Sequence, residues 1–236
     1  MKTIGIIGGI SWLSSAEYYR IINQLVNQQL GGVHSARLIL YSVDYEEIKQ
    51  LTFADNWAGI AEMIGSIAQA LEAAGAHCIL LGANTMHRIA KDVQARIRIP
   101  LLHIAQATGA AIRAAGLNSV ALLGTKYTME LGFYQEVLTD FGIKVVLPDA
   151  ADRQFVHDAI YNEMGKNIFL PATKARLLSI IDSVGKQGAQ GVILGCTEIP
   201  LMIQQADSPL PVFDTSFIHA AAAVRFALSL PEDLPL

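Results

Sequence analysis

The chain alternates short apolar runs with longer segments in which apolar residues recur at helical spacing. Residues 3–9 are almost wholly apolar apart from glycine, which is typical of a strand buried on both faces of a parallel sheet. Residues 57–74 instead carry apolar side chains every three or four positions, which predicts a helix covering one face of a sheet. By the same criteria we predict strands at 3–9, 37–43, 77–82, 100–104, 119–125, 144–147, 191–195 and 211–214. We predict helices at 14–30, 57–74, 87–98, 106–115, 127–141, 152–164, 172–187 and 218–228, with 44–55 as a polar connection.

One stretch of the chain occurs twice. Residues 75–87 read GAHCILLGANTMH and residues 188–200 read GAQGVILGCTEIP, at an offset of 113, and this register places Ala83 opposite Cys196. Two further similarities, at offsets of 116 and 111, relate 3–9 to 119–125 and 100–113 to 211–225. We therefore predict an α/β fold of two pseudosymmetric parallel-sheet half-domains, 1–99 plus 211–236 and 100–210, with a ligand held between them at the carboxyl ends of the strands.

Composition and charge narrow the function classes. The chain has 52% hydrophobic and 16% charged residues and a net charge of −4, and no basic run argues for nucleic acid as a partner. No apolar run approaches the roughly 18 residues of a membrane span. The apolar run near the amino terminus is also too short for the core of a signal peptide. We expect a cytoplasmic protein without a membrane partner. The G-x-x-G-G spacing of residues 5–9 differs from the dinucleotide fingerprint.

The two cysteines have different surroundings. Cys196 follows Gly195 at a predicted strand end and precedes Thr197 and Glu198. Backbone N–H groups at such a position are expected to lower the thiol pKa below about 8.5, so Cys196 is a candidate nucleophile or general base. Cys78 lies inside a predicted strand, where we expect a small buried hydrophobic residue. The pair forms neither a disulfide framework nor a metal-ligand spacing, so no metal is expected.

Polar side chains gather at the predicted strand ends. Their amide and hydroxyl groups suit a small molecule with carboxylate groups, although each residue alone equally fits a helix cap. His87 and His219 are open to either a structural or a catalytic role. The polar set comprises Asn84, Thr85, Thr125, Thr128 and Thr197. Separately, Ser11 can either cap the helix that follows it or bind a carboxylate.

Five motifs together resemble those of the aspartate/glutamate racemase family, in its order and along essentially the whole chain. They are GGISW at 8–12, ANTMH at 83–87, LGTKYTME at 123–130, GCTE at 195–198 and PVFDT at 211–215. The resemblance implies two pseudosymmetric α/β domains, a homodimer, no cofactor and a small dicarboxylate amino-acid substrate. It also implies a two-base mechanism, in which one cysteine removes the α-proton and a thiol on the opposite face returns one.

The resemblance carries site roles to individual residues. Cys196 matches the second catalytic cysteine of the family. Asn84, Thr85, Thr128 and Thr197 resemble the residues that bind the α-carboxylate and amino group. Lys166 is our candidate for the side-chain carboxylate.

Ala83 departs from the family pattern, because a methyl group stands where the first catalytic cysteine is usual. The chain can be a natural one-cysteine racemase of aspartate or glutamate, or a variant engineered at position 83. It can also be a single-cysteine decarboxylase or isomerase of small diacids, or a dicarboxylate-binding protein without activity.

Overall fold

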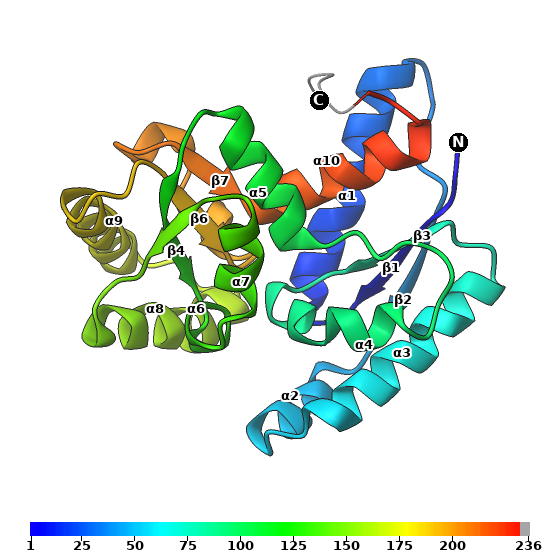
Figure 1. The fold of residues 1–236 in the computed structure, drawn as a ribbon, viewed down its shortest axis with the longest axis horizontal. Helices are drawn as coiled ribbons and strands as arrows, with labels where there is room; N and C mark the ends of the chain where they lie inside the picture. The colour runs from blue at the N-terminus through cyan, green and yellow to red at the C-terminus, as the bar shows by residue number, and fades with distance from the viewer. Residues whose placement is uncertain (232–236) are drawn as a thin grey trace. The chain divides into compact units, whose positions relative to one another are not determined.

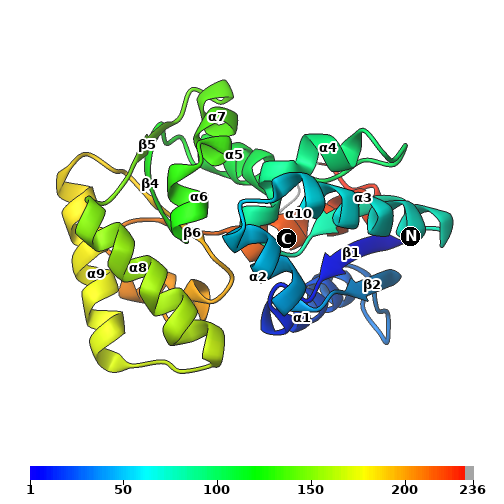
Figure 2. The ribbon, with the colours of Figure 1, turned by 90° about the horizontal axis from the view of Figure 1, so that it is seen from below.

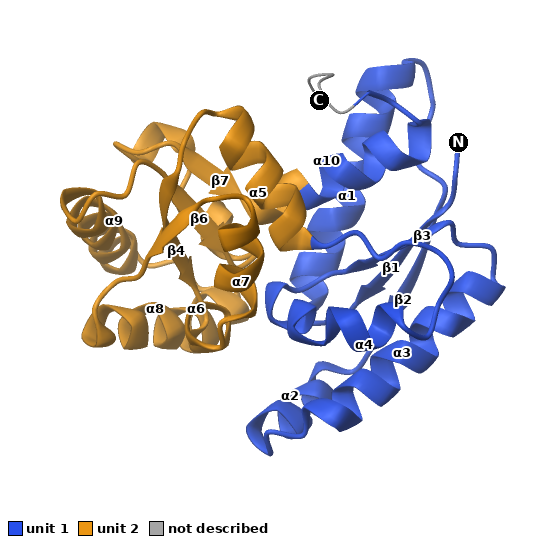
Figure 3. Ribbon diagram, viewed as in Figure 1, with its two compact units in different colours: residues 1–103, 219–236 blue, residues 104–218 orange. Residues whose placement is uncertain are grey.

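The computed structural model describes residues 1–231, which form two compact units. Unit 1 comprises Met1–His103 and the chain from His219 onward, and unit 2 comprises Ile104–Ile218 (Figure 3). The elements run along the chain as drawn in Figure 1. Sequence analysis placed 211–236 in the first domain and 100–210 in the second. In the structure the strand at 212–214 belongs to unit 2, because it pairs with a strand of that unit.

Unit 1 is built on a three-stranded parallel sheet in the order β2-β1-β3, with β1 at Ile4–Gly8, β2 at Leu38–Ser42 and β3 at Cys78–Leu81. Successive side chains of a strand point to opposite faces. Ile4 and Ile6 accordingly pack with α1 (Trp12–Leu30) and with the unit 1 part of α10 (Thr215–Leu228), whereas Ile7 packs with α3 (Trp57–Ala73). Burial on both faces explains the continuous apolar run that predicted β1.

Unit 2 holds a four-stranded parallel sheet in the order β5-β4-β6-β7. One core of mainly aliphatic side chains joins this sheet to its helices. The strands are β4 (Ser119–Gly124), β5 (Lys144–Val146), β6 (Val192–Gly195) and β7 (Val212–Asp214). The helices are α5 (Ile104–Ala114), α6 (Lys126–Glu130), α7 (Phe133–Asp140), α8 (Ala150–Asn162) and α9 (Pro171–Lys186).

The two sheets repeat one topology, which confirms the predicted pair of similar α/β halves. In each unit the first strand is central, the second is an edge strand, and the third lies on the other side of the first. The counterpart of β7 in unit 1 is a single parallel bridge between Ile79 and Leu101. The duplicated stretch of sequence therefore encodes β3 and β6 together with the loops that follow them.

Four predictions of secondary structure were wrong in detail. The predicted connection at 44–55 contains a helix, α2 (Tyr45–Phe53). The Asp44 side chain caps this helix by accepting the Glu46 N–H, and Ile48 of the helix is buried in the core. The predicted helix at 127–141 divides into α6 and α7 at Gly132, whose φ of 79° interrupts the helix. The helix at 87–98 is a 3₁₀ turn, η1 (Asn84–Ile89), followed by α4 (Ala90–Gln94), and the strand at 100–104 is reduced to the bridge at Leu101.

No helix within residues 1–231 combines the length and apolar character needed to cross a membrane. Three further 3₁₀ turns complete the described elements: η2 (Met164–Lys166), η3 (Ile199–Leu201) and η4 (Gln205–Asp207).

Candidate active site

Cys196 lies directly after the carboxyl end of β6, where the sequence predicted it. β6 is fully buried between its neighbours β4 and β7, and Cys196 itself is half-buried. Gly195 pairs with Gly124 of β4, and a Cβ on Gly195 would come within 3.0 Å of the Leu123 carbonyl oxygen. Glycine is therefore required for the close approach of the two strands that fixes the backbone at Cys196.

The Cys196 thiol is paired with a buried carboxylate. Its Sγ donates to Glu198 Oε2 at 2.8 Å, and the Thr197 hydroxyl donates to the same oxygen at 2.9 Å. Thr197 and Glu198 are both buried. The carboxylate is thus held against the thiol by a second hydrogen bond, in a place where it can accept the thiol proton.

The Cys196 pKa corrects the prediction that it would be low. Burial raises this pKa well above its ordinary value, and the charge and hydrogen bond of Glu198 raise it further. Hydrogen bonds from the backbone at Glu198 and Thr197 act in the opposite direction, as sequence analysis anticipated, but they are the smaller effects. Cys196 is therefore a protonated thiol at neutral pH, with a base beside it.

Two threonines adjoin the end of β6. Thr125 caps α6 by accepting the Thr128 N–H at 3.3 Å, and the two hydroxyl oxygens lie 3.2 Å apart. A Cβ on Gly195 would lie 3.3 Å from the Thr128 side chain, so Thr128 packs beside the residue that precedes Cys196. The structure thus brings Thr128, Thr197 and Cys196 together at one edge of the unit 2 sheet.

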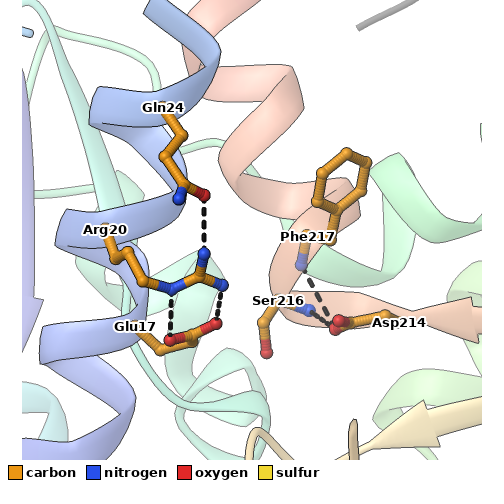
Figure 4. Close-up of polar contacts among 6 residues, drawn as sticks. All are labelled: Glu17, Arg20, Gln24, Asp214, Ser216 and Phe217. Atoms are coloured by element: carbon orange, nitrogen blue, oxygen red, sulfur yellow. Dashed lines mark hydrogen bonds and ion pairs between the residues drawn. The ribbon is translucent and has the colours of Figure 1, made fainter. Parts of the chain in front are cut away.

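The chain after β7 supports this edge. The Thr215 hydroxyl donates to the Leu194 carbonyl oxygen of β6 at 2.9 Å. Asp214 begins α10 as a cap, because its Oδ1 accepts the backbone N–H groups of Ser216 and Phe217 (Figure 4). These bonds hold the end of β7 beside β6, the strand that precedes Cys196.

In unit 1 the corresponding loop carries Ala83, Asn84 and Thr85. Ala83 follows β3 and precedes η1, in the position that Cys196 occupies after β6. The Ala83 carbonyl oxygen accepts a hydrogen bond from His87 Nδ1 at 3.2 Å. Asn84 is buried and Thr85 is half-buried. The predicted contact of this loop with a substrate stays a prediction, as does the predicted placing of a ligand between the two halves.

Ser11 caps a helix in the structure. Its side chain accepts the Ser14 N–H at the start of α1, at 3.5 Å. The Ser15 hydroxyl donates to the Ser11 carbonyl oxygen and accepts the Gly9 N–H. Of the two roles considered for Ser11, capping is the one that the structure contains.

Three histidines lie together in unit 1: His87 and His219 are buried, and His103 is half-buried. His219 Nε2 donates to the Leu102 carbonyl oxygen at 2.7 Å, so its Nδ1 accepts from the Tyr18 hydroxyl at 2.8 Å. Burial lowers the pKa of His219 and His103 to about 4 each, and holds that of His87 well below its usual value. The ring centroid of His87 lies 4.8 Å from that of His103 and 5.3 Å from that of His219. This packing favours the structural role for His87 and His219.

Lys166 closes the turn η2 after α8 and is exposed. Its N–H donates to the Glu163 carbonyl oxygen, and among residues 1–231 its side chain takes part in no ion pair. The structure does not bring Lys166 into contact with Cys196, and its role toward a substrate stays a prediction.

The sequence analysis did not include Glu198 in the site. Its position two residues after Cys196 was visible, but spacing alone does not reveal that the side chain turns back to the thiol. Within the described chain no group of three or more histidine, cysteine, aspartate or glutamate residues is arranged to hold a metal ion.

Comparisons with known proteins agree on the kind of protein. A profile of the Asp/Glu/Hydantoin racemase family matches residues 7–223. A structure described as a putative Asp/Glu racemase from Yersinia pestis is 47% identical, with a TM-score of 0.91 over 97% of this chain and 100% of that one. An aspartate racemase homologue from Pyrococcus horikoshii is 34% identical, with a TM-score of 0.86 over the same shares. A broad specificity amino-acid racemase from Bacillus subtilis is 29% identical over 67% of this chain and 68% of its own. The chain therefore belongs to the Asp/Glu/Hydantoin racemase family, as its motifs predicted.

Proposed function

We propose that this chain is a cofactor-independent racemase or epimerase of an acidic amino acid, aspartate or glutamate, in which Cys196 exchanges the proton at the substrate Cα. The hydrogen bond from Cys196 Sγ to the buried Glu198 carboxylate is the observation that carries the proposal. Membership of the family, and the similarity to structures described as racemases or racemase homologues, support the substrate class.

The proposed step begins with a proton transfer from the Cys196 thiol to Glu198. The thiolate then takes the Cα proton, and the electron pair of the broken C–H bond stays on the substrate as a carbanion delocalised into the α-carboxylate. Backbone hydrogen bonds at Thr197 and Glu198 favour the thiolate while it exists. Once Glu198 has released its proton to solvent, the thiol passes the former Cα proton to Glu198 and receives a deuteron from solvent by the same route. Return of that deuteron from Cys196 to Cα then gives the exchange.

In this mechanism the catalytic thiol acts on only one face of the substrate Cα. Return of the proton by Cys196 restores the original enantiomer, whereas inversion needs a donor on the opposite face. The Ala83 methyl group neither donates nor accepts a proton. We therefore expect exchange at Cα to be faster than inversion, with inversion limited by proton delivery from water or a neighbouring group.

We also propose that side chains with amide, hydroxyl or ammonium groups bind the substrate. Thr128 and Thr197 adjoin Cys196 in unit 2, and the exposed Lys166 supplies a positive charge for the side-chain carboxylate. Asn84, Thr85 and Ser11 are the candidates from unit 1.

The test is proton NMR of L- and D-aspartate and L- and D-glutamate in deuterium oxide. We expect the Cα proton signal of one enantiomer to disappear with the original protein. Cys196→Ala should slow this loss at least about 100-fold, the usual contribution of one general acid or base. Cys78→Ala is the matched control, because it removes the other thiol, which is fully buried in unit 1. Exchange that survives Cys196→Ala would contradict the proposal.

A second candidate is decarboxylation of a small diacid, favoured by the raised pKa of Cys196. Loss of carbon dioxide breaks a C–C bond and leaves a carbanion, which a protonated thiol can protonate from one face without a second catalytic group. Solvent then returns a proton to the thiolate. Carbon dioxide release from a malonate-type substrate, absent with Cys196→Ala, would favour this candidate over the racemase.

A further inference from the structure

A short helix in unit 2 carries one of the proposed substrate-binding residues. Helix α6 has only 5 residues, Lys126–Glu130, and a helix of this length is not stable without contacts to the rest of the protein. Its third residue is the buried Thr128, whose side chain packs beside Gly195, the residue that precedes Cys196. The position of Thr128 at this edge of the sheet therefore depends on the contacts that hold α6.

Two side chains cap the start of α6. The Thr125 hydroxyl oxygen accepts the Thr128 N–H at 3.3 Å, within the same turn. Helix α8 lies beside α6 in unit 2 (Figure 2), and from it His157 Nδ1 accepts the Lys126 N–H at 3.2 Å. The first N–H groups of a helix have no partner inside the helix, so these two bonds fix the first turn of α6.

Two tyrosines hold the His157 ring in this orientation. The ring centroid lies 4.7 Å from that of Tyr161, one turn along α8, and 6.0 Å from that of Tyr127 in α6. Because Nδ1 accepts a hydrogen bond, the neutral ring carries its proton on Nε2. Protonation adds a proton to Nδ1, so a charged His157 ring cannot accept the Lys126 N–H.

The other end of α6 is attached to the same helix. Arg153 lies one turn before His157 in α8, and its Nε donates to Glu130 Oε1 at 2.7 Å. The Nη1 of Arg153 donates to the Pro148 carbonyl oxygen, also at 2.7 Å. Helix α6 is thus bonded to α8 at both ends, by an ion pair at its carboxyl end and at its start by a hydrogen bond that only a neutral histidine accepts.

The charged groups around His157 come from both helices. Burial of the ring has the largest effect on its pKa and lowers it from the ordinary value of 6.5. Asp158 of α8 and Glu130 of α6 act to raise this pKa, whereas Lys126 acts to lower it. The two tyrosines also face the ring, and Arg153 lies one turn from it with its charge paired. His157 is therefore neutral at pH 7 and gains a proton in more acid solution.

We propose that His157 is a positioning residue, which by accepting the Lys126 N–H holds Thr128 where it binds the substrate. The inference rests on the proposed function, because that function assigns Thr128 to substrate binding. It also gives substrate binding a pH dependence, since protonation of His157 breaks its bond to Lys126. The hydrogen bond between Cys196 and Glu198 does not involve His157, so the chemical step should keep its rate.

The first test measures the hydrogen bond in the protein without substrate. In amide NMR spectra the Lys126 N–H signal should shift with pH, following the protonation of the His157 ring. His157→Asn keeps an acceptor, because Asn Oδ1 takes about the place of histidine Nδ1, but it does not titrate in this range. In this variant the Lys126 signal should lose that pH dependence. A Lys126 signal that ignores the protonation of His157 in the original chain would overturn the proposal.

The second test measures KM and kcat for exchange of the substrate Cα proton at about pH 7.5 and about pH 5.5, on either side of the ordinary histidine pKa. His157→Phe has no acceptor and should raise KM about 2- to 10-fold at the higher pH, the usual contribution of one hydrogen bond, with kcat unchanged. The KM of the original chain should rise at the lower pH, and that of His157→Asn should rise less. A merely structural role would instead reduce the folded fraction, and therefore kcat, with KM unchanged.

His77→Asn is the matched control. His77 Nδ1 accepts the Thr3 N–H at 3.2 Å in unit 1, so the same substitution replaces the same kind of bond away from Cys196, and KM should keep its original pH dependence. An original KM in His157→Phe, or the same rise in KM at acid pH in His157→Asn as in the original chain, would overturn this inference and leave the proposed function standing. Absence of exchange by the original chain at both pH values would contradict the proposed function, and this inference with it.

Discussion

The thiol of Cys196 and the carboxylate of Glu198 are joined by a hydrogen bond of 2.8 Å, in which the sulfur donates. The arrangement keeps the thiol protonated at rest and places its base within reach. It differs from a thiolate stabilised by positive groups, because here the neighbouring charge is negative and raises the thiol pKa.

Glu198→Gln should lower the Cys196 pKa, because it removes the negative charge but keeps an acceptor oxygen. Alkylation by iodoacetamide, followed by mass spectrometry across a pH series, should show Cys196 reacting at lower pH in the variant. Cys78 is the internal control, since burial raises its pKa to about 12 and it should stay unlabelled in both folded proteins. An unchanged pH profile would mean that the carboxylate charge does not act on the thiol. The variant should also exchange the substrate Cα proton more slowly, because Gln cannot accept the thiol proton.

Gly195→Ala should both destabilise the protein and slow exchange. The added Cβ would meet the Leu123 carbonyl oxygen and the Leu122 side chain at 3.0 Å. We expect a loss of about 1–3 kcal/mol in the free energy of unfolding, as for other overpacked sites, measured in urea. Gly75→Ala is a poor control, because Gly75 has a positive φ that strains an alanine. Ala16→Gly, on the exposed face of α1, exchanges the same two residue types without a positive φ. A variant with full stability and full exchange would show that the strands tolerate wider spacing.

Cys78→Ala should cost stability without affecting chemistry. Cys78 is fully buried in unit 1 against the α1 and α10 side chains, which confirms its predicted structural character. We expect the free energy of unfolding to fall by about 1–2 kcal/mol, near the low end of large-to-small core changes. Exchange per folded molecule should stay within twofold of the original; a large loss of exchange would give Cys78 a role that the structure does not indicate.

Unit 1 should lose stability as the pH falls from about 6.5 toward 4. Burial lowers the pKa of His103 and His219 to about 4, so these rings stay neutral in the folded state over this range. In the unfolded chain they take up protons near their ordinary pKa, so the unfolded state binds more protons and stability rises with pH. Each histidine should cost about 2 kcal/mol between pH 7 and pH 5.

Urea unfolding at pH 7 and pH 5 measures this difference. His219→Gln and His103→Gln remove one titrating ring each and should reduce the pH dependence accordingly. His34→Gln, in an exposed loop of the same unit, is the control that should leave it unchanged. A pH dependence of equal size in all four proteins would exclude these rings as its source.

The position of the Cys196 thiol could be predicted from sequence, because the residue that follows a buried apolar strand ending in glycine lies at the carboxyl edge of the sheet. The same logic found the duplicated topology and the structural character of Cys78. It did not find α2, since the polar residues around Asp44 look like a loop until the Asp44 cap and the buried Ile48 are seen together. It also gave the wrong direction for the Cys196 pKa, because burial and the rotamer of Glu198 are tertiary features that spacing does not specify.

We propose that Cys196 exchanges the Cα proton from one face of the substrate, with no proton donor at Ala83 on the other. Proton NMR and chiral analysis of aspartate and glutamate in deuterium oxide, with the original chain and with Ala83→Cys, test it most directly. We expect exchange of one enantiomer with little inversion in the original chain, and racemisation in Ala83→Cys. Equal racemisation by both proteins, or no exchange by either, would contradict it.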